Sequence, residues 1–549
     1  MFITAGLMLF PAAGHDDAHI SYWAARSLSE TGRILNFNGE RVEQSSSLLH
    51  VLLLAFLSKL TGIEMVTLGR LTAIAAGAAA LVVLSRFVKG IAGTGAALSA
   101  VWIASTSVYL VYGSYCGMET PLVALTGLWV IISLAGYLGK ATPPTLLGPG
   151  LGMGAYLLVR PESPILLVGL VAGAATIYGW AGGDRLPSGV DRRAMRGRLL
   201  KLAALLGALL VVLLGFRGLT FGQWAPQPVR AKFGGLLWAS LGQGLMYFKQ
   251  SVWDLGPAAM GLAVALAAGG GVLLAIQFRK GAWDPRHWLS MLYVGGNAAF
   301  ILLSGGDWME GGRFFVHFLP VSIAILAVAL DRVAHSRLPM ILVSVLLIGS
   351  GTAQLYEFAA KGSTGCPLKS QIICGGDYDL TEFSWFEQHN PINRRDMPVV
   401  KVLDRLVDQI GRRRPGPVVI LSGQMGFIPY HLTERHAGGI RFIDRWGLVE
   451  RTLTDCPSAR RVARSQKGLL LDYQEYFRIA REQNPDCPLP LPDIIYDVHV
   501  EYSDQVAEQG YGIVYLQRGR VSCEDSPYGI SSNEFVALRN DLMRTLGLQ

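Results

Sequence analysis

The stretch 191–216, DRRAMRGRLLKLAALLGALLVVLLGF, decides the fold class of this chain. Its first eight residues include four arginines, and the 18 residues after them contain a single charged side chain, Lys201. About 20 apolar residues in a helix cross the hydrocarbon core of a bilayer, and basic residues collect in the loops on its cytoplasmic side. The stretch therefore predicts a membrane-spanning helix that begins in the cytoplasm.

Apolar runs of this kind recur through the first 360 of the 549 residues. Hydrophobic residues make up 51% of the chain and charged residues 16%, whereas a typical soluble protein has about 25% charged residues. The run 48–60 is too short to span and predicts a helix that lies at the membrane interface. We predict eleven spans, at about 2–13, 66–86, 92–112, 121–138, 144–160, 164–180, 199–216, 257–277, 287–304, 314–331 and 339–357. The first would be only about 20 Å long, so either the membrane is thin there or the span begins upstream.

The charges between these runs predict the orientation of the chain. With the N-terminus in the cytoplasm, the cytoplasmic loops hold only four acidic residues, Asp184, Asp191, Asp284 and Asp331. The same loops hold fourteen basic residues: Arg86, Lys89, Lys140, Arg185, Arg192, Arg193, Arg196, Arg198, Lys201, Arg279, Lys280, Arg286, Arg332 and Arg337. Counting 48–60 as a span would reverse every later loop. We therefore expect a multi-pass protein of the inner (cytoplasmic) membrane with its tail outside, and the net charge of +8 needs no nucleic-acid partner.

The composition changes sharply near residue 359. Short apolar runs at 418–421, 440–443, 493–500 and 512–516 predict strands, and a helical pattern covers 400–410. The predicted fold class is a polytopic α-helical membrane domain, 1–358, followed by a soluble extracytoplasmic α/β domain, 359–549. The tail cysteines show no C-x-x-C spacing, so a zinc site is not expected, and an oxidising compartment would allow two disulfides whose pairing stays open. These cysteines are Cys366, Cys374, Cys456, Cys487 and Cys523.

Charged residues gather in the five predicted outer loops, beside glycine or proline. The longest loop, 14–47, begins with adjacent carboxylates, Asp16 and Asp17, directly after the first span. Charges at the depth of a bilayer are costly, so they usually face a cavity and mark a functional site. The other outer loops contribute Glu119, Arg160, Glu162, Arg230, Lys232, Asp307, Glu310 and Arg313.

These residue types suit sugar transfer from a lipid phosphate. A carboxylate beside the membrane can act as a general base on a sugar hydroxyl or orient it, and we assign this role to Asp16 and Asp17. Arginine and lysine bind phosphate as charge develops on a leaving group. We therefore predict that Arg160, Arg230, Lys232 and Arg313 surround the donor phosphate.

Two other interpretations of the aspartate pair stay open. The pair can serve as the N-cap of a helix over 18–29, and capping would not exclude catalysis. Two carboxylates can also hold a divalent cation, although no third ligand is identifiable in the sequence. No other cofactor is expected, since the tail has neither a G-x-G-x-x-G nor a Walker loop.

The motifs of these loops resemble the GT-C superfamily of membrane glycosyltransferases, and within it the AftB-like family, named for a mycobacterial terminal β-arabinofuranosyltransferase. The family pattern D-D-A-[FY]-I-S-[FY]-R is similar to residues 16–23, DDAHISYW, with Trp23 in place of the arginine and Arg26 one turn further on. The similar motifs follow one another through nearly the whole chain. They are GRILNFNGERVE at 32–43, GMET at 117–120, RPE at 160–162, APQPVRAK at 225–232, GGDWMEGGRF at 305–314 and IPYH at 428–431.

The resemblance implies a GT-C-like fold and a specific chemistry. It implies transfer of arabinofuranose, or a related sugar, from a polyprenyl-phosphate donor to a cell-envelope glycan or a surface glycoprotein, outside the membrane. It also places Asp16 or Asp17 at the catalytic centre. The residues that we expect to contact the sugar or the acceptor are Tyr22, Arg26, Glu119, Glu162, Gln227, Asp307 and Trp308.

Two rival functions use the same membrane architecture. A flippase or transporter of lipid-linked sugars would need ionisable groups near the middle of the bilayer, and the central spans show almost none. A non-catalytic subunit for envelope assembly would use the tail as a receptor.

Overall fold

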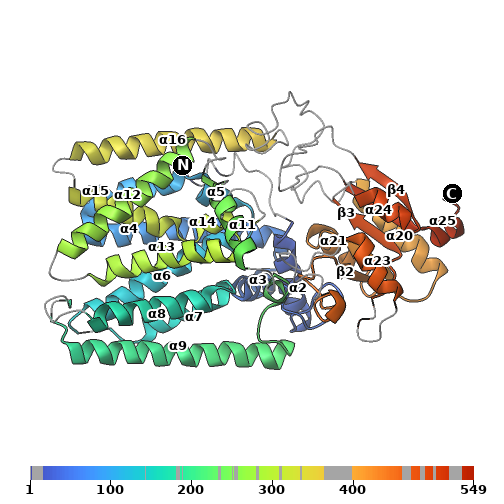
Figure 1. Ribbon diagram of the computed structural model, residues 1–549, viewed down its shortest axis with the longest axis horizontal. Coiled ribbons are helices and arrows are strands. Elements are labelled where there is room, and N and C mark those ends of the chain that lie inside the picture. Colours follow the sequence, from blue (N-terminus) through green and yellow to red (C-terminus); the bar gives the residue numbers. More distant parts are fainter. Residues whose placement is uncertain are drawn as a thin grey trace. The chain divides into compact units, whose positions relative to one another are not determined.

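The computed structural model describes most of the chain in two compact units (Figure 1). The described residues are 2, 6, 16–142, 144–180, 186–187, 189–232, 237–249, 251–252, 257–279, 284–307, 312–333, 337–363, 398–459, 472–482, 487, 489–498, 502–517 and 534–548. The helical unit comprises 1–11, 70–219 and 241–360, and the mixed unit comprises 12–69, 220–240 and 361–549.

The helical unit contains a helix wherever the sequence predicts a span beyond the first. The span predicted at 2–13 lies almost wholly outside the described residues. The helices are α4 (Met65–Thr106), α5 (Val108–Tyr115), α6 (Thr120–Gly139), α7 (Leu147–Val159), α8 (Ser163–Trp180), α9 (Arg192–Phe221), α11 (Leu237–Lys249), α12 (Pro257–Arg279), α13 (Pro285–Ser304), α14 (Arg313–Val316), α15 (Leu319–Val333) and α16 (Arg337–Ser363).

The long helix α4 shows where two predicted spans meet. Its backbone breaks at Gly93, whose φ of 84° is in the left-handed region that glycine adopts without steric cost. This break lies within the second of the two predicted spans, 92–112. That span is interrupted again at Ser107, where an extended backbone precedes α5.

In the part of the chain that the structure describes, three helices, α4, α6 and α9, combine the length and hydropathy needed to cross a membrane. Shorter apolar helices lie at Leu48–Thr61, Leu147–Val159, Ser163–Gly179, Gly261–Ile276 and Met340–Leu355. The fold class predicted from the sequence, a polytopic α-helical membrane protein with a C-terminal α/β domain, is confirmed. The number of eleven spans stays a prediction.

Basic residues hold one end of the helical unit together. Arg198, at the start of α9, donates to the carbonyl groups of Leu138, Lys140 and Ala141 at 2.9, 2.7 and 2.8 Å. These carbonyls lie at the C-terminus of α6, where a cation complements the negative end of the helix dipole. Arg286, at the start of α13, donates to the carbonyl group of Gly90 at 3.0 Å. The loops predicted to be cytoplasmic thus meet through their arginines.

The mixed unit is built around a five-stranded sheet with the order β2-β1-β3-β5-β4. Strands β2, β1 and β3 are parallel, whereas β5 pairs antiparallel with β3 and with β4. Its elements are α2 (Ala18–Thr31), α3 (Leu48–Thr61), α10 (Gln227–Lys232), α20 (Pro398–Arg413), β1 (Val418–Ser422), α21 (Phe427–Arg435), β2 (Ile440–Asp444), α23 (Tyr473–Arg481), β3 (Ile494–Asp497), α24 (Ser503–Glu508), β4 (Tyr511–Gln517), β5 (Glu534–Arg539) and α25 (Asn540–Leu546).

The predicted strands and the helix at 48–60 are all present, but the sequence did not reveal β5. This strand lies inside the sheet, between β3 and β4, and residues 534–538 are all buried. A short apolar run without alternation does not distinguish a buried strand from a buried helix. Only the pairing with two neighbouring strands makes this segment extended.

The outer loop 14–47 groups with the mixed unit, although the sequence predicts it as part of the membrane domain 1–358. Asn38 uses its side-chain amide on the edge strand β2: it donates to the carbonyl group of Phe442 and accepts from the amide of Phe442, both at 2.8 Å. Asn36 donates to the carbonyl group of Val449 at 3.1 Å. The loop therefore covers a sheet edge that would otherwise present unpaired backbone groups.

A disulfide joins Cys456 and Cys487 across 31 residues of the tail. Both cysteines belong to a buried core with Tyr473, Phe477 and Ala231, the last of which comes from α10. Closing a loop of this length restricts the unfolded chain and so stabilises the fold. Cys366, Cys374 and Cys523 lie outside the described residues, and Cys116 is a buried free thiol of the helical unit.

Labelling with a membrane-impermeant maleimide tests the predicted orientation. Ala507, on α24, and Ala194, at the start of α9, are both exposed, so a cysteine at either position should disturb little. In intact cells, A507C should be labelled and A194C should not, each measured against the parent chain. Labelling of A194C but not A507C would overturn the predicted orientation.

Candidate active site

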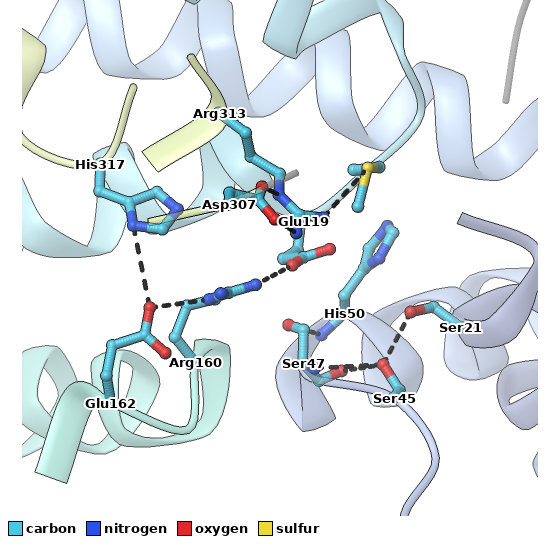
Figure 2. A network of polar contacts seen from close by, with 11 residues as sticks. Ser21, Ser45, Ser47, His50, Glu119, Arg160, Glu162, Asp307, Arg313 and His317 are labelled. Carbon is cyan, nitrogen blue, oxygen red and sulfur yellow. Dashed lines mark hydrogen bonds and ion pairs between the residues drawn. The ribbon is translucent and has the colours of Figure 1, made fainter. Parts of the chain in front are cut away.

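Buried charges from three loops of the helical unit form a network of ion pairs (Figure 2). Arg160 donates to Glu119 at 2.7 Å through Nη1 and to Glu162 at 2.9 Å through Nε. Arg313 forms a forked pair with Asp307, with distances of 2.6 and 2.9 Å. All five side chains are at most 8% exposed.

The ends of the helices bring these residues together. Glu119 precedes α6, Arg160 follows α7 and Glu162 precedes α8. Asp307 follows α13, and Arg313 begins α14. Helix α6 packs against α7 and α13, and α8 packs against α13, so short connections return the chain to the same end of the bundle. This is the end opposite Arg198 and Arg286, as the loop charges predict.

Two ring side chains, Phe314 and His317, lie beside the network of ion pairs. The guanidinium groups of Arg160 and Arg313 lie 5.3 and 5.6 Å from the ring centre of Phe314, within the range of a cation–π contact. His317 lies 3.9 Å from Glu162 and is 2% exposed. No sequence pattern singles out His317, because it lies in the apolar run 314–331, where a lone histidine carries no motif.

The balance of charge in this network bears on phosphate binding. Two arginines face three carboxylates, so these five described side chains together carry a net charge of −1 when His317 is neutral. A phosphate would have to compete with Glu119, Glu162 and Asp307 for the guanidinium donors. The role of Arg160 and Arg313 as phosphate ligands stays a prediction. Trp308 and Glu310, from the same loop, lie outside the described residues.

The predicted catalytic pair belongs to the mixed unit, and its two members have different surroundings. The Asp16 side chain is 7% exposed, and its Oδ1 accepts a hydrogen bond of 2.7 Å from the amide of Phe427 at the start of α21. Asp17 occupies the N-cap position of α2 without a side-chain capping bond. Asp17 is therefore at the N-cap position that the capping interpretation predicts, but its side chain does not cap α2. The carboxylate that accepts from the first amide of a helix is that of Asp16, and this helix is α21.

Tyr22 and Arg26, predicted to contact the sugar, lie along α2. Tyr22 is fully buried, with its ring 5.2 Å from that of His19. Arg26 pairs with Glu30 and Glu434 at 2.8 and 2.7 Å. The nearby imidazole of His431, whose Nδ1 lies 3.6 Å from Oε2 of Glu434, lowers the pKa of Glu434 together with Arg26 to about 2. Arg26 thus connects α2 to α21, which no pattern in the sequence indicated.

Gln227 and Arg230 attach α10 to the tail. The side-chain nitrogen of Gln227 lies 2.8, 2.7 and 2.8 Å from the oxygens of Gly447, Glu450 and Thr454. Arg230 donates to Asp455 at 2.8 Å, and Lys232 is exposed. Gln227 and Arg230 therefore have clear structural contacts within the mixed unit. Their assignments to the acceptor and the donor phosphate stay predictions.

Among the described residues, no three or more His, Cys, Asp or Glu side chains come together in a group that could hold a metal ion. A divalent cation at Asp16 and Asp17 therefore stays an open interpretation of the sequence. No sequence pattern singles out Asp444 and Glu450, two buried acids of the tail, because single acids beside a short strand carry no motif. Burial raises the pKa of Asp444 to about 6 and that of Glu450 to about 8.

The buried Glu450 predicts a pH dependence of stability. Its pKa in the folded chain lies above the ordinary value of 4.5, so stability is full below pH 4.5 and declines as pH rises through 8. We expect the wild-type chain in detergent to lose several degrees of thermal stability between pH 6 and pH 9. Glu450→Gln should remove part of this loss. An equal loss in both chains would show that Glu450 does not titrate in the fold.

Comparison with known proteins gives a similarity in structure alone. No protein-family model matches the sequence, and no curated protein matches it. The chain is similar to the crystal structure of ArnT from Cupriavidus metallidurans in the apo state, at 12% identity and a TM-score of 0.47, with 98% of each chain covered. ArnT bound to undecaprenyl phosphate gives 12% identity and a TM-score of 0.49, with 98% of this chain and 97% of ArnT covered. The Archaeoglobus fulgidus oligosaccharyltransferase in complex with Zn and sulfate gives 13% identity and a TM-score of 0.49, with 97% of this chain and 72% of the oligosaccharyltransferase chain covered.

Proposed function

We propose that this chain is a membrane glycosyltransferase that moves arabinofuranose, or a related sugar, from polyprenyl phosphate to a cell-envelope glycan or a surface glycoprotein. The reaction would take place on the outer side of the inner membrane. The observation that carries the proposal is the buried carboxylate of Asp16, held in one orientation on the loop that follows the first predicted span. The order of the family-like motifs along the chain supports the donor class.

The proposed step needs one base and one site for the leaving group. Asp16 takes the proton of the acceptor hydroxyl while the acceptor oxygen bonds to the anomeric carbon of the sugar. The bond from that carbon to the phosphate oxygen breaks, and its electron pair leaves with the polyprenyl phosphate. Basic side chains that neutralise this phosphate lower the barrier, because its charge increases in the transition state.

A transfer assay decides between this proposal and its rivals. Purified protein is given synthetic polyprenyl-phosphate arabinofuranose together with arabinan oligosaccharides, and the extended product is measured. Other polyprenyl-phosphate pentoses and hexoses in parallel identify the sugar. Movement of the donor across a vesicle membrane without transfer would favour a flippase instead, and absence of both activities with every donor would favour an assembly subunit.

Arg230 and Lys232 are the predicted phosphate ligands that are most easily tested. The partner of Arg230, Asp455, is half exposed, and such a surface pair contributes only about 0–1 kcal/mol, so Arg230 can exchange it for a phosphate. Each charge-assisted contact is worth about 1.5–3 kcal/mol. Arg230→Ala and Lys232→Ala should therefore each lower kcat/KM for the donor by about ten- to a hundredfold.

A matched variant separates this role from attachment of the tail. Asp455→Asn removes the charge that Arg230 meets in the structure, but leaves Arg230 in place. If Arg230 binds phosphate, Asp455→Asn should keep donor kinetics close to wild type. Equal losses in Arg230→Ala and Asp455→Asn would show that the pair only holds α10 to the tail.

A further inference from the structure

The tail sheet reverses its strand order at β1, which is the position where α/β domains commonly bind ligands. Strand β1 lies between β2 and β3, and all three are parallel, so the chain leaves β1 toward β2 and later returns to its other side. Ligands of open α/β sheets bind outside the carboxyl ends of the strands at such a reversal of strand order. Anions bind at the N-terminus of the helix that follows, where backbone amides and the helix dipole favour negative charge.

In this chain, the group at the N-terminus of α21 is the carboxylate of Asp16. The turn 422–426, SGQMG, leads from β1 into α21, and the first amide of α21, that of Phe427, donates to Oδ1 of Asp16 at 2.7 Å. Burial raises the pKa of Tyr496, near the end of the neighbouring strand β3, and the negative charges of Glu534 and Asp16 add to this rise. The outer loop thus places its carboxylate at the start of α21, beside the carboxyl ends of β1 and β3.

Gly426 makes this placement possible. A Cβ atom at Gly426 would lie 2.0 Å from the carbonyl oxygen of Asp16 and 2.6 Å from its Oδ2. Any side chain at Gly426 would therefore push the backbone of Asp16 and its carboxylate out of place. His19 also contacts both residues of this hydrogen bond. Its amide donates to the carbonyl of Asp16 at 3.0 Å, and its ring centre lies 5.2 Å from that of Phe427.

We propose that the turn between β1 and α21 positions Asp16 for catalysis, with Gly426 and the amide of Phe427 as positioning groups. This inference rests on the proposed function. The first amide of α21 holds the carboxylate in one orientation and donates to one of its oxygens. The tail is then required for the chemical step itself, with short acceptors as well as long ones.

The test uses the full chain and compares two glycines of the mixed unit. Gly426→Ala should lower kcat about ten- to a hundredfold with a short acceptor, since displacement of a reacting group by about 1 Å can cost that much. Gly411→Ala is the control, because Gly411 lies on α20 with no atom within 4 Å of an added Cβ. It should leave kcat unchanged. The donor is the polyprenyl-phosphate sugar that the wild type transfers.

The pH profile separates positioning from a purely structural contact. Loss of the amide removes a donor to the negative charge of the carboxylate, so the acid limb of kcat/KM should move to higher pH, by up to about one unit. Phe427→Pro removes this amide at a helix position that accepts proline, whereas Phe427→Ala removes the same ring and keeps the amide. Only the proline variant should shift the acid limb.

Each remaining result counts against the inference. If folded Gly426→Ala and Phe427→Pro keep the wild-type kcat and acid limb, the contact only docks the loop. If Phe427→Pro fails to fold while Phe427→Ala folds, the amide is needed for structure and the positioning role is rejected. Absence of transfer by the wild type would instead overturn the proposed function, so the two failures are distinguishable.

Discussion

Asp16→Asn should lower kcat by about 10²–10⁴, which is the usual cost of losing a general base. Asparagine is nearly isosteric with aspartate, and its Oδ1 can still accept from the amide of Phe427, so the loop should remain docked. The variant then removes only the capacity to take a proton. Turnover with a saturating acceptor, together with thermal unfolding in detergent, measures the two effects separately.

Asp17→Asn is the matched comparison, because it changes the adjacent residue by the same atoms. Asp17 occupies the N-cap position of α2 without a capping bond from its side chain, and asparagine caps about as well as aspartate. We expect this variant to keep most of its activity. If both variants transfer sugar at the wild-type rate, the catalytic centre lies elsewhere, and Glu119 and Asp307 become the next candidates.

Arg160→Ala should lower the free energy of unfolding by about 3–5 kcal/mol, the range measured when one partner of a buried ion pair is removed. Arg160 meets both Glu119 and Glu162, and all three side chains are at most 6% exposed. Truncation leaves two carboxylates in a buried place without the cation that faced them. The midpoint of thermal unfolding in detergent should fall by many degrees.

Two further variants make this expectation specific to the network. Arg286→Ala removes a more exposed arginine of the same unit, paired with Asp284, and should cost about 1 kcal/mol or less. A triple variant, Arg160→Met with Glu119→Gln and Glu162→Gln, removes all the charges at once and should recover much of the lost stability without recovering activity. Equal destabilisation by Arg160→Ala and Arg286→Ala would show that the network contributes no more than a surface pair.

Local pattern predicted the elements of this protein well. Long apolar runs predicted the helices from 65 to 363 other than α10 and α11, and the short run 48–60 predicted α3 almost to the residue. Runs of branched and aromatic residues predicted β1, β2, β3 and β4. These predictions succeed because hydrophobic length and periodicity act within one segment, and a segment of 5 to 20 residues contains all the information that they need.

The sequence alone determined the apolar helices, the change to an α/β tail, and which loops carry charge. Only the tertiary structure decided that the loop 14–47 and α10 belong with the tail, and that the carboxylate of Asp16 faces an amide 411 residues away. It also decided that Arg160 meets Glu119 and that Gln227 attaches α10 to the tail. Such partners are not encoded in any local pattern, because two distant groups meet only after whole elements have packed, and each must find a counter-charge or a hydrogen bond where packing buries it.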